Sequence, residues 1–421
     1  MSDMPDVMEH VTCLGCGCAC DDIGVVVRNG RIAEARRACS LGAAWFGDGR
    51  VPAESRIDGA PATVESALDA AATALTAARR ALIYLALDTS CETQRAAVAI
   101  ADALGASVDG VSSSTVLDGV LAAQRRGRVA ATLGEIRNRA DCLVFWGTDP
   151  ANRYPRYTSR YAPDPVGLFV PGGRRGRVVV AVDVGTARGP ADADLRLTIE
   201  ATDERDVIDA LRASLAGRAP AGPPDPRVAD LARTLSTAHY AVIVYDAEPA
   251  AQPDARSRGR AEALTALGQQ LNATIRASVM GLRGGGNRSG AEAVLTWQTG
   301  FPMAVDFSRG HPRYRPDDTA PDLVRSGVAD VVLVVGAPAP DAPLPAGQAR
   351  RIIIGPRAST IAPMPHVAID TGVAGIHEAG LAFRMDDVPL PLRAPLPGPA
   401  PAADIVGALD ARVRARLVVR P

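Results

Sequence analysis

Four cysteines near the start of the chain have the spacing of ligands to one metal centre. Cys13, Cys16 and Cys20 lie three and four residues apart, and Cys39 follows after a longer segment. Thiolates at this spacing on a tight turn can converge on a [4Fe-4S] cluster or on Zn²⁺. Cys18 lies among them as an additional thiol. We therefore predict that Cys13, Cys16, Cys20 and Cys39 form a metal site or the remnant of one.

Disulfide bonds and unligated thiols are the less favoured interpretations of these cysteines. No apolar signal segment precedes them, and a chain of 421 residues is much too long to be a small disulfide-stapled protein. Four thiolates suit iron–sulfur clusters and zinc alike, so the spacing leaves the identity of the metal open.

A β-hairpin is expected to bring Cys39 back to the other three cysteines. Residues 23–27 are rich in β-branched side chains, Asn29 and Gly30 are typical of a type I′ turn, and residues 31–35 return. Residues 1–58 are therefore predicted to form a small Cys-rich N-terminal domain. Such a short segment needs its metal or a neighbouring domain, because it has little core of its own.

Beyond this segment, short apolar runs alternate with alanine-rich amphipathic stretches. Nearly continuous apolar runs are typical of parallel strands covered on both faces. Thr89 and Glu92 form a candidate capping box for a helix that Gly105 would end. The repeated order of strand, loop and helix predicts an α/β fold with two doubly wound domains. The predicted strands are residues 81–87, 142–146, 178–183, 241–246, 331–336 and 352–355.

Two proline-rich stretches mark the expected domain organisation. Residues 219–227 are predicted to be a surface loop, and residues 389–401 to begin a C-terminal extension with a short helix near residues 404–417. The expected domains are 1–58 (Cys-rich), 59–150 with 292–388 (first α/β domain), 151–291 (nested second α/β domain) and 389–421 (C-terminal extension).

The composition excludes several classes of partner. The chain is 47% apolar and only 4% aromatic, and its 46 basic and 47 acidic residues nearly cancel. There is thus no global charge that favours nucleic acid. No run approaches the roughly 18 apolar residues of a membrane span. We expect a soluble, cytoplasmic protein without nucleic-acid or membrane partners.

The chain resembles the B subunit of formylmethanofuran dehydrogenase, which carries molybdopterin or tungstopterin. The first matching block is the cysteine segment itself, Cys13 to Ile23. The resemblance implies a molybdopterin-oxidoreductase-like fold, with two doubly wound α/β domains and a small N-terminal Cys-rich β domain. Further similar blocks are residues 89–95, 133–141, 145–150, 155–156, 159–161, 296–302, 309–314 and, more weakly, 383–386.

One departure from that family changes the expected function. The redox family has a Cys-His-Gly step whose cysteine or selenocysteine ligates molybdenum or tungsten, and the corresponding residues here are Leu117, Asp118 and Gly119. Leu117 has no donor atom, and a hard carboxylate does not replace a soft thiolate. No cysteine lies between Cys91 and Cys142. No molybdopterin is therefore expected.

A non-redox relative fits this loss of the ligand. The chain most resembles the B subunit of the bacterial formyltransferase/hydrolase complex of methylotrophs. In that complex a formyl group passes from tetrahydromethanopterin to methylofuran and is hydrolysed to formate. The resemblance implies a scaffold subunit without its own active site, with amidohydrolase-type, formyltransferase and C-type subunits as partners and methylofuran as a cofactor of the complex. Two alternatives stay open: an active molybdenum or tungsten dehydrogenase subunit, and an iron–sulfur electron-transfer module.

Three other groups of residues could do chemistry, but a structural role is favoured for each. His311 could be a ligand or a base. Gly284 to Gly286 could cradle a phosphate, but no clear buried strand leads into them, so a mobile loop or a relic of a pterin contact is favoured. A solvated or interface arginine face is favoured over an acidic-ligand site for Arg153, Arg156, Arg160, Arg174, Arg175 and Arg177.

Overall fold

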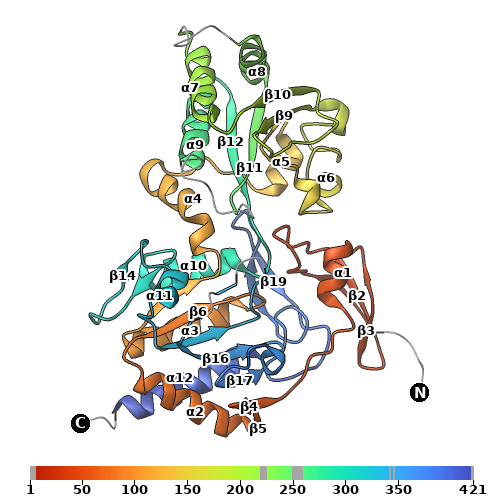
Figure 1. Cartoon of the computed structure of the whole chain (residues 1–421). Helices are drawn as coiled ribbons and strands as arrows, with labels where there is room; N and C mark the ends of the chain where they lie inside the picture. Colours follow the sequence, from red (N-terminus) through yellow and green to blue (C-terminus); the bar gives the residue numbers. More distant parts are fainter. Residues whose placement is uncertain (1–5, 219–224, 249–258, 341–342, 345–346, 419–421) are drawn as a thin grey trace. The chain divides into compact units, whose positions relative to one another are not determined.

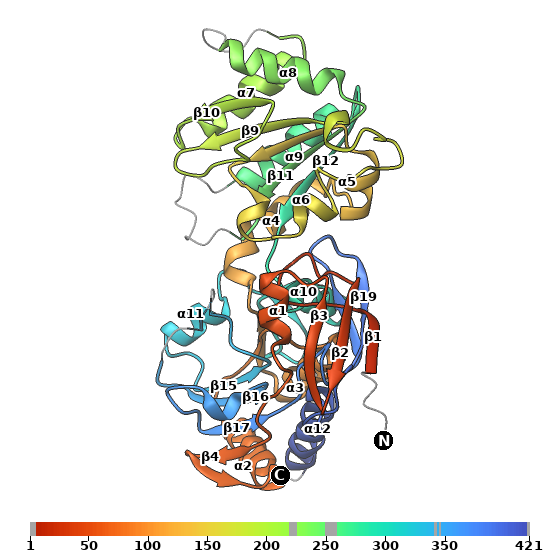
Figure 2. The ribbon, with the colours of Figure 1, turned by 90° about the vertical axis from the view of Figure 1, so that its right-hand side faces the viewer.

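The computed structural model describes residues 6–218, 225–248, 259–340, 343–344 and 347–418. The chain divides into two compact units (Figures 1 and 2). The first unit consists of residues 1–114 and 284–421, and the second of residues 115–283, which are inserted between them. Both units combine parallel strands with helices, and this confirms the predicted α/β class.

The first unit contains a nine-stranded sheet in the order β14-β13-β7-β6-β15-β16-β17-β4-β5. The five central strands from β7 to β17 are parallel, and the outer strands at both edges pair antiparallel. The strands are β4 (Ser55–Ile57), β5 (Ala60–Ala62), β6 (Ala81–Leu85), β7 (Ser107–Gly110), β13 (Val305–Asp306), β14 (Arg313–Tyr314), β15 (Val331–Val335), β16 (Arg350–Gly355) and β17 (Val367–Asp370).

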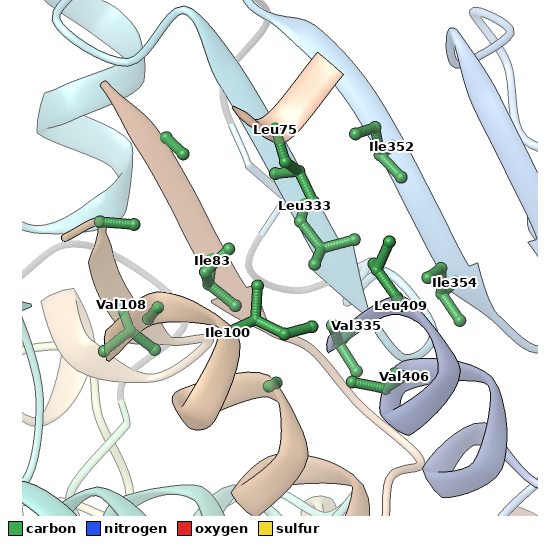
Figure 3. Close-up of a cluster of buried hydrophobic side chains, with 14 of the residues drawn as sticks. Leu75, Ile83, Ile100, Val108, Leu333, Val335, Ile352, Ile354, Val406 and Leu409 are labelled. Atoms are coloured by element: carbon green, nitrogen blue, oxygen red, sulfur yellow. The ribbon is translucent and has the colours of Figure 1, made fainter. Parts of the chain in front are cut away.

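Helices cover both faces of this sheet because successive side chains of its strands point to opposite sides. Ile83 and Leu333 pack with α2, α3 and α12 in one core, part of which Figure 3 shows. Leu82 and Val332, one residue earlier in each strand, pack with α11 on the other face. The helices are α2 (Val64–Ala77), α3 (Cys91–Leu104), α10 (Arg288–Thr299), α11 (Ala320–Arg325), α12 (Ala402–Val418) and the 3-10 turn η3 (Ala358–Thr360).

Two small antiparallel sheets complete the first unit. Asn29 and Gly30 both have positive φ, 51° and 67°, so the predicted type I′ hairpin turn is confirmed. The elements are β1 (Asp6–Val11), β2 (Ile23–Arg28), β3 (Arg31–Arg36), α1 (Ser40–Phe46), β18 (Gly380–Phe383) and β19 (Pro389–Leu392).

The second unit is built on a five-stranded, fully parallel sheet in the order β10-β9-β8-β11-β12. Its strands are β8 (Cys142–Trp146), β9 (Val178–Val184), β10 (Leu195–Ile199), β11 (Tyr240–Asp246) and β12 (Arg276–Leu282). Its helices are α4 (Ser113–Arg126), α5 (Leu133–Arg139), η1 (Pro150–Asn152), α6 (Tyr157–Arg160), η2 (Gly173–Gly176), α7 (Glu204–Leu215), α8 (Pro226–Thr237) and α9 (Arg260–Leu271). Apolar side chains of α7, α8 and α9 pack against one face of this sheet.

All six predicted strands are present, but the division of the chain differs from the expected domains. The strand of residues 142–146, expected in the first domain, lies between β9 and β11 of the second unit. Residues 389–421 are not a separate extension, because β19 pairs with β18 and α12 packs against α2 and α3. Residues 1–58 fall within the first unit.

Two local predictions need correction. Ser90, and not Thr89, caps α3 by accepting a hydrogen bond from the backbone N–H of Thr93, whereas the predicted C-terminal cap at Gly105 is confirmed by its left-handed conformation. Part of the proline-rich segment begins a helix, since α8 starts at Pro226. Its residues 219–224 lie outside the described residues.

Candidate functional site

The loop between β1 and β2 carries the first three cysteines of the predicted metal site. The backbone N–H of Cys13 donates a 2.9 Å hydrogen bond to the carbonyl oxygen of Cys20, which closes the loop. The N–H of Ala19 bonds the carbonyl of Cys16 at 3.1 Å. Cys13 and Cys20 are each 6% exposed, and Cys16 is half-buried. The closed loop therefore keeps Cys13 and Cys20 buried and leaves Cys16 partly accessible.

The fourth cysteine reaches this loop through α1. Cys39 is the N-cap residue of α1. A Cβ atom added to Gly42, one turn into the helix, would lie 3.2 Å from the sulfur of Cys13 and 3.9 Å from that of Cys39. These two sulfurs thus lie on the same side of α1, against a residue that has no side chain. The predicted return of Cys39 to the first cysteines is therefore observed.

A glycine-rich turn packs directly on the cysteine loop. The N–H of Gly286 donates a 2.9 Å hydrogen bond to the carbonyl oxygen of Leu14. A Cβ atom on Gly285 would lie 2.3 Å from the same oxygen and 2.7 Å from the Cα of Cys16. The buried strand β12 leads into this turn, contrary to the sequence-based expectation. Close backbone approach, and not phosphate binding, explains a residue without a side chain at 285.

The thiols influence one another in this packed environment. Burial, together with the nearby Cys16, Cys20 and Cys39, raises the pKa of Cys13 above its usual range. A hydrogen bond with Cys16, followed by burial, raises the pKa of Cys18, while the positive charge of Arg384 opposes the shift. The raised pKa of Cys13 means that binding of a metal at this thiol would release its proton.

The donor set suits a centre with four thiolates, and the identity of the metal stays open. In the part of the chain that the structure describes, no three His, Cys, Asp or Glu side chains come close enough to bind one metal ion. Four thiolates around Zn²⁺, each at about 2.3 Å, lie about 3.8 Å from one another. A [4Fe-4S] cluster holds its cysteines further apart. Metal binding by Cys13, Cys16, Cys20 and Cys39 stays a prediction.

Asp118, which the resemblance to the redox family aligns with that family's histidine, caps a helix. Its Oδ1 accepts a 2.7 Å hydrogen bond from the N–H of Gly259, and its Oδ2 accepts one of 3.1 Å from Ala261. These N–H groups belong to the start of α9, which has no side-chain cap of its own. A carboxylate at a helix N-terminus is stabilising. Both oxygens of Asp118 therefore serve the fold of the second unit.

The two remaining cysteines are buried in other parts of the fold. Burial raises the pKa of Cys91 to about 11 and that of Cys142 to about 12. Each is 2% exposed, Cys91 at the start of α3 and Cys142 in β8. The interpretation of Cys142 as a small core residue agrees with its burial.

Two residues that the sequence alone did not single out, Asn287 and Glu378, bind residues 89–95. This segment is one of those that resemble the family, and both residues connect it to elements far along the chain. The side chain of Asn287, at φ 64°, donates to the carbonyl of Thr89 at 2.8 Å and accepts from the N–H of Phe383 at 2.8 Å. The buried carboxylate of Glu378 accepts from Thr93 at 2.9 Å and from the N–H of Ala402, at the start of α12, at 2.7 Å. No local sequence signal marks either residue, because their partners lie far along the chain.

A further missed contact joins α1 to the end of β6. Trp45 Nε1 donates a 3.1 Å hydrogen bond to Oδ1 of Asp88. Burial raises the pKa of Asp88, and the bond from Trp45 partly offsets this shift. The cysteine segment is therefore anchored to the large sheet of the first unit by a polar contact as well as by its glycine contacts.

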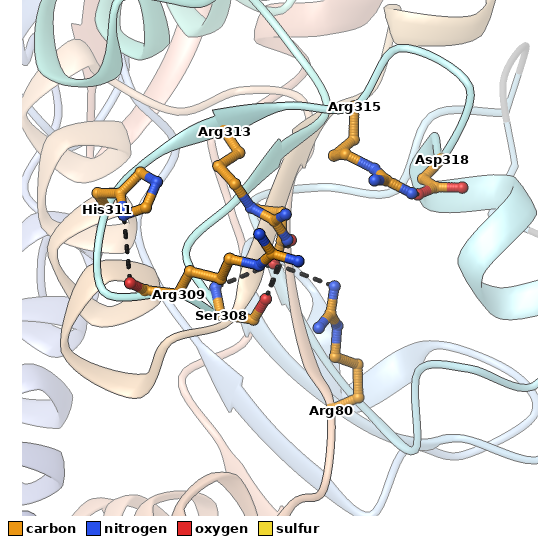
Figure 4. A network of polar contacts seen from close by, with 8 residues as sticks. Arg80, Ser308, Arg309, His311, Arg313, Arg315 and Asp318 are labelled. Carbon is orange, nitrogen blue, oxygen red and sulfur yellow. Dashed lines mark hydrogen bonds and ion pairs between the residues drawn. The ribbon is translucent and has the colours of Figure 1, made fainter.

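The other candidate residues take structural positions. His311 is exposed, and its Nδ1 lies 3.2 Å from the carbonyl oxygen of Arg309 (Figure 4). In the same region Arg80 and Arg313 both bind the buried carboxylate of Asp306. No contact of His311 with an acid that would activate it occurs among the described residues.

Three of the candidate arginines of the second unit bind carboxylates or carbonyl oxygens of the chain itself. Arg153 pairs with Asp246 at 2.9 Å, and Arg174 pairs with Asp194 at 3.0 Å. Arg177 is buried and donates to the carbonyl oxygens of Ala140, Pro163, Pro165 and Arg137. These contacts support the structural interpretation over an acidic-ligand site. None of the described helices is long and apolar enough to cross a membrane.

Several known proteins are similar to this chain in sequence. No protein-family model matches the chain. The chain is 32% identical to the B subunit of tungsten-containing formylmethanofuran dehydrogenase 2 from Methanocaldococcus jannaschii, covering 98% of this chain and 100% of that protein. It is 31% identical to the protein of the same description from Methanococcus maripaludis, covering 94% and 95%. It is 29% identical to the B subunit of the formyltransferase/hydrolase complex Fhc from Methylorubrum extorquens, covering 68% and 75%.

A solved structure agrees with the sequence comparisons. A chain in the crystal structure of the formyltransferase/hydrolase complex FhcABCD from Methylorubrum extorquens, in complex with methylofuran, matches with a TM-score of 0.73 and 26% identity. The match covers 86% of this chain and 99% of that chain. The α/β fold of this chain is thus similar to that of a chain from a multi-subunit complex. The chain belongs to the family of formylmethanofuran dehydrogenase B subunits.

Proposed function

We propose that the chain is a non-redox scaffold subunit of a cytoplasmic formyltransferase/hydrolase complex that converts formyl-tetrahydromethanopterin to formate through methylofuran. The observation that carries the proposal is the pair Leu117 and Asp118. The family resemblance aligns Leu117 with the metal ligand of the redox family, and both oxygens of Asp118 accept hydrogen bonds from the N-terminus of α9. A protein can keep its fold and lose its catalytic site. The residues of the site, and not the fold, therefore decide between a redox and a non-redox subunit.

The overall sequence identity does not decide between the two kinds of relative, the dehydrogenase subunit and the Fhc subunit. The chain is 32% identical to a tungsten-containing dehydrogenase subunit and 29% identical to the Fhc subunit. Neither Cys91 nor Cys142 lies in the aligned segment at residues 117–119, and both are 2% exposed, which agrees with the non-redox choice. In the proposed complex, amidohydrolase-type and formyltransferase subunits carry out the chemistry, a C-type subunit completes the assembly, and methylofuran carries the formyl group.

In this proposal the four N-terminal cysteines hold a structural centre. Their donor chemistry suits a [4Fe-4S] cluster or zinc. When bound, the centre would cross-link the loop between β1 and β2 to α1. Cys13, Cys16, Cys20 and Cys39 would supply the thiolates, and the turn at Gly285 would keep the loop closed against the first unit.

The test is metal analysis of the complex, purified without oxygen after co-expression of this chain with its partner subunits. We expect formyl hydrolysis without added electron acceptor, and tungsten and molybdenum far below one atom per chain. A tungsten-containing B subunit from a dehydrogenase, purified in the same way, serves as the positive control. Stoichiometric tungsten or molybdenum in this chain would contradict the proposal. Turnover that requires an electron acceptor and Cys13 would favour the iron–sulfur electron-transfer module.

A further inference from the structure

A basic groove of about 930 Å³ lies on the second unit. It is lined from α5, from α9 and from the first residues of β12, whose labels can be followed in Figure 1. Three arginines, Arg128, Arg139 and Arg276, line it together with a single acid, Glu135. The groove therefore carries a net positive charge in a chain whose formal net charge is -1.

Two of these arginines differ from most others in the unit. Arg153, Arg174 and Arg196 pair with carboxylates at 2.7 to 3.0 Å. Among the described residues, neither Arg139 nor Arg276 forms an ion pair, and both are exposed. An arginine whose planar guanidinium group has no carboxylate partner within its own chain is suited to bind the carboxylates of another molecule.

Exposed apolar side chains form the rim of the groove. Leu168 is 76% exposed and Phe169 is 61% exposed, and both line the groove. Val166, two residues before Leu168 in the same loop, is 62% exposed. The guanidinium of Arg139 lies 4.7 Å from the centre of the Phe169 ring. Aromatic and arginine side chains in one exposed patch are typical of the residues that dominate binding energies at interfaces.

The loop that presents these side chains is fixed against α5. The N–H of Phe169 donates a 2.8 Å hydrogen bond to the carbonyl oxygen of Asn138, and the N–H of Leu168 bonds its side-chain oxygen at 3.2 Å. A Cβ atom on Gly167 would lie 2.2 Å from the carbonyl oxygen of Arg137. The exposed side chains are thus held in place before binding, which lowers the entropic cost of forming an interface.

We propose that this groove and its apolar rim are the docking surface for an acidic segment of another protein subunit of the same complex. Carboxylates of that segment would bind Arg139 and Arg276, while an apolar side chain would cover Leu168 and Phe169. A protein segment fits better than a small anion, because the exposed apolar rim offers nothing to a small anion. The inference does not depend on the non-redox assignment, since the relatives of both kinds are subunits of complexes.

A site-specific photo-crosslinker at Leu168 tests the location of the interface. The chain is co-expressed with its amidohydrolase-type, formyltransferase and C-type partners, and the purified complex is irradiated. We expect a crosslink to an acidic segment of one partner. Crosslinks only to a second copy of this chain, or none in the assembled complex, would overturn the proposal.

Charge reversal tests the role of the arginines. We expect R139E/R276E to weaken binding of that partner by about tenfold or more, and the reversal of two partner acids to restore it. R205E/R233E is the matched control, because it changes the net charge equally on the same unit and its side chains are 66% and 71% exposed. It should bind within about twofold of the wild type. Equal losses in both variants, or no loss in R139E/R276E, would contradict the proposal. Hydrogen exchange of residues 166–170 in the complex is a second readout, and no protection there would also contradict it.

Discussion

Asp118 on α4 caps α9 through a 2.7 Å hydrogen bond to the N–H of Gly259. Replacement of Asp118 by alanine removes this acceptor and the one for Ala261. We expect the free energy of unfolding to fall by about 1–2 kcal/mol, which is typical for loss of a helix cap. Chemical denaturation measures this loss. Asp209→Ala, at an exposed acid of the same unit, is the control and should change stability by less than about 0.5 kcal/mol. Equal losses in the two variants would show that Asp118 does not act as a cap.

A methyl group at residue 285 should disrupt the packing of the glycine-rich turn against the cysteine loop. Its Cβ would overlap the carbonyl oxygen of Leu14 and the backbone of Cys16. We expect Gly285→Ala to destabilise the protein by about 1–3 kcal/mol, as overpacking does. Gly407→Ala is the matched control with the opposite sign. Gly407 lies in α12 with no atom within 4 Å of an added Cβ, so alanine there should stabilise by about 0.5–1 kcal/mol. Melting temperatures of both variants measure the contrast, and a stabilising Gly285→Ala would refute the close packing.

His377 should make stability depend on pH. Its Nε2 donates to the carbonyl oxygen of Gly49 at 2.7 Å, and its Nδ1 accepts from the N–H of Val373 at 3.1 Å, so the neutral ring fits this site. Burial lowers the pKa of His377 below its usual value of 6.5. The unfolded state therefore takes up a proton first as the pH falls. This contribution to stability is complete above pH 6.5 and is lost below it.

The pH dependence of the melting temperature checks this prediction between about pH 7.5 and 5. We expect His377→Gln to reduce the loss of stability on acidification. His311→Gln changes an exposed histidine with one backbone contact and should leave the slope as it is. An unchanged slope in His377→Gln would mean that other groups cause the acid sensitivity.

Removal of one thiolate should empty the N-terminal centre. We expect Cys13→Ser to lose most of the metal bound by the wild type, because only three of the four predicted ligands, Cys16, Cys20 and Cys39, then remain. Iron, acid-labile sulfide and zinc are measured in protein purified without oxygen. Cys142→Ala removes a buried thiol of the second unit and should retain the metal. A metal content that is the same in Cys13→Ser and the wild type would exclude this residue as a ligand.

Sequence reasoning predicted the elements of the fold better than the boundaries of its domains. Every predicted strand is present because buried parallel strands are continuous apolar runs that can be recognised locally. The strand of residues 142–146 was nevertheless assigned to the wrong domain. Its sheet partners are β9 and β11, and strand order depends on contacts between residues far apart in the chain.

The four N-terminal cysteines were recognisable from the sequence alone, which determined their spacing and predicted the hairpin that returns Cys39. The loss of the metal ligand at Leu117 stays a prediction from the sequence. Only the tertiary structure decided what surrounds these residues. It brought Gly285 onto the cysteine loop, Asn287 onto Thr89 and the carboxylate of Asp118 onto α9. Each of these contacts joins distant segments, and their geometry depends on the packing of whole elements, which no local pattern records.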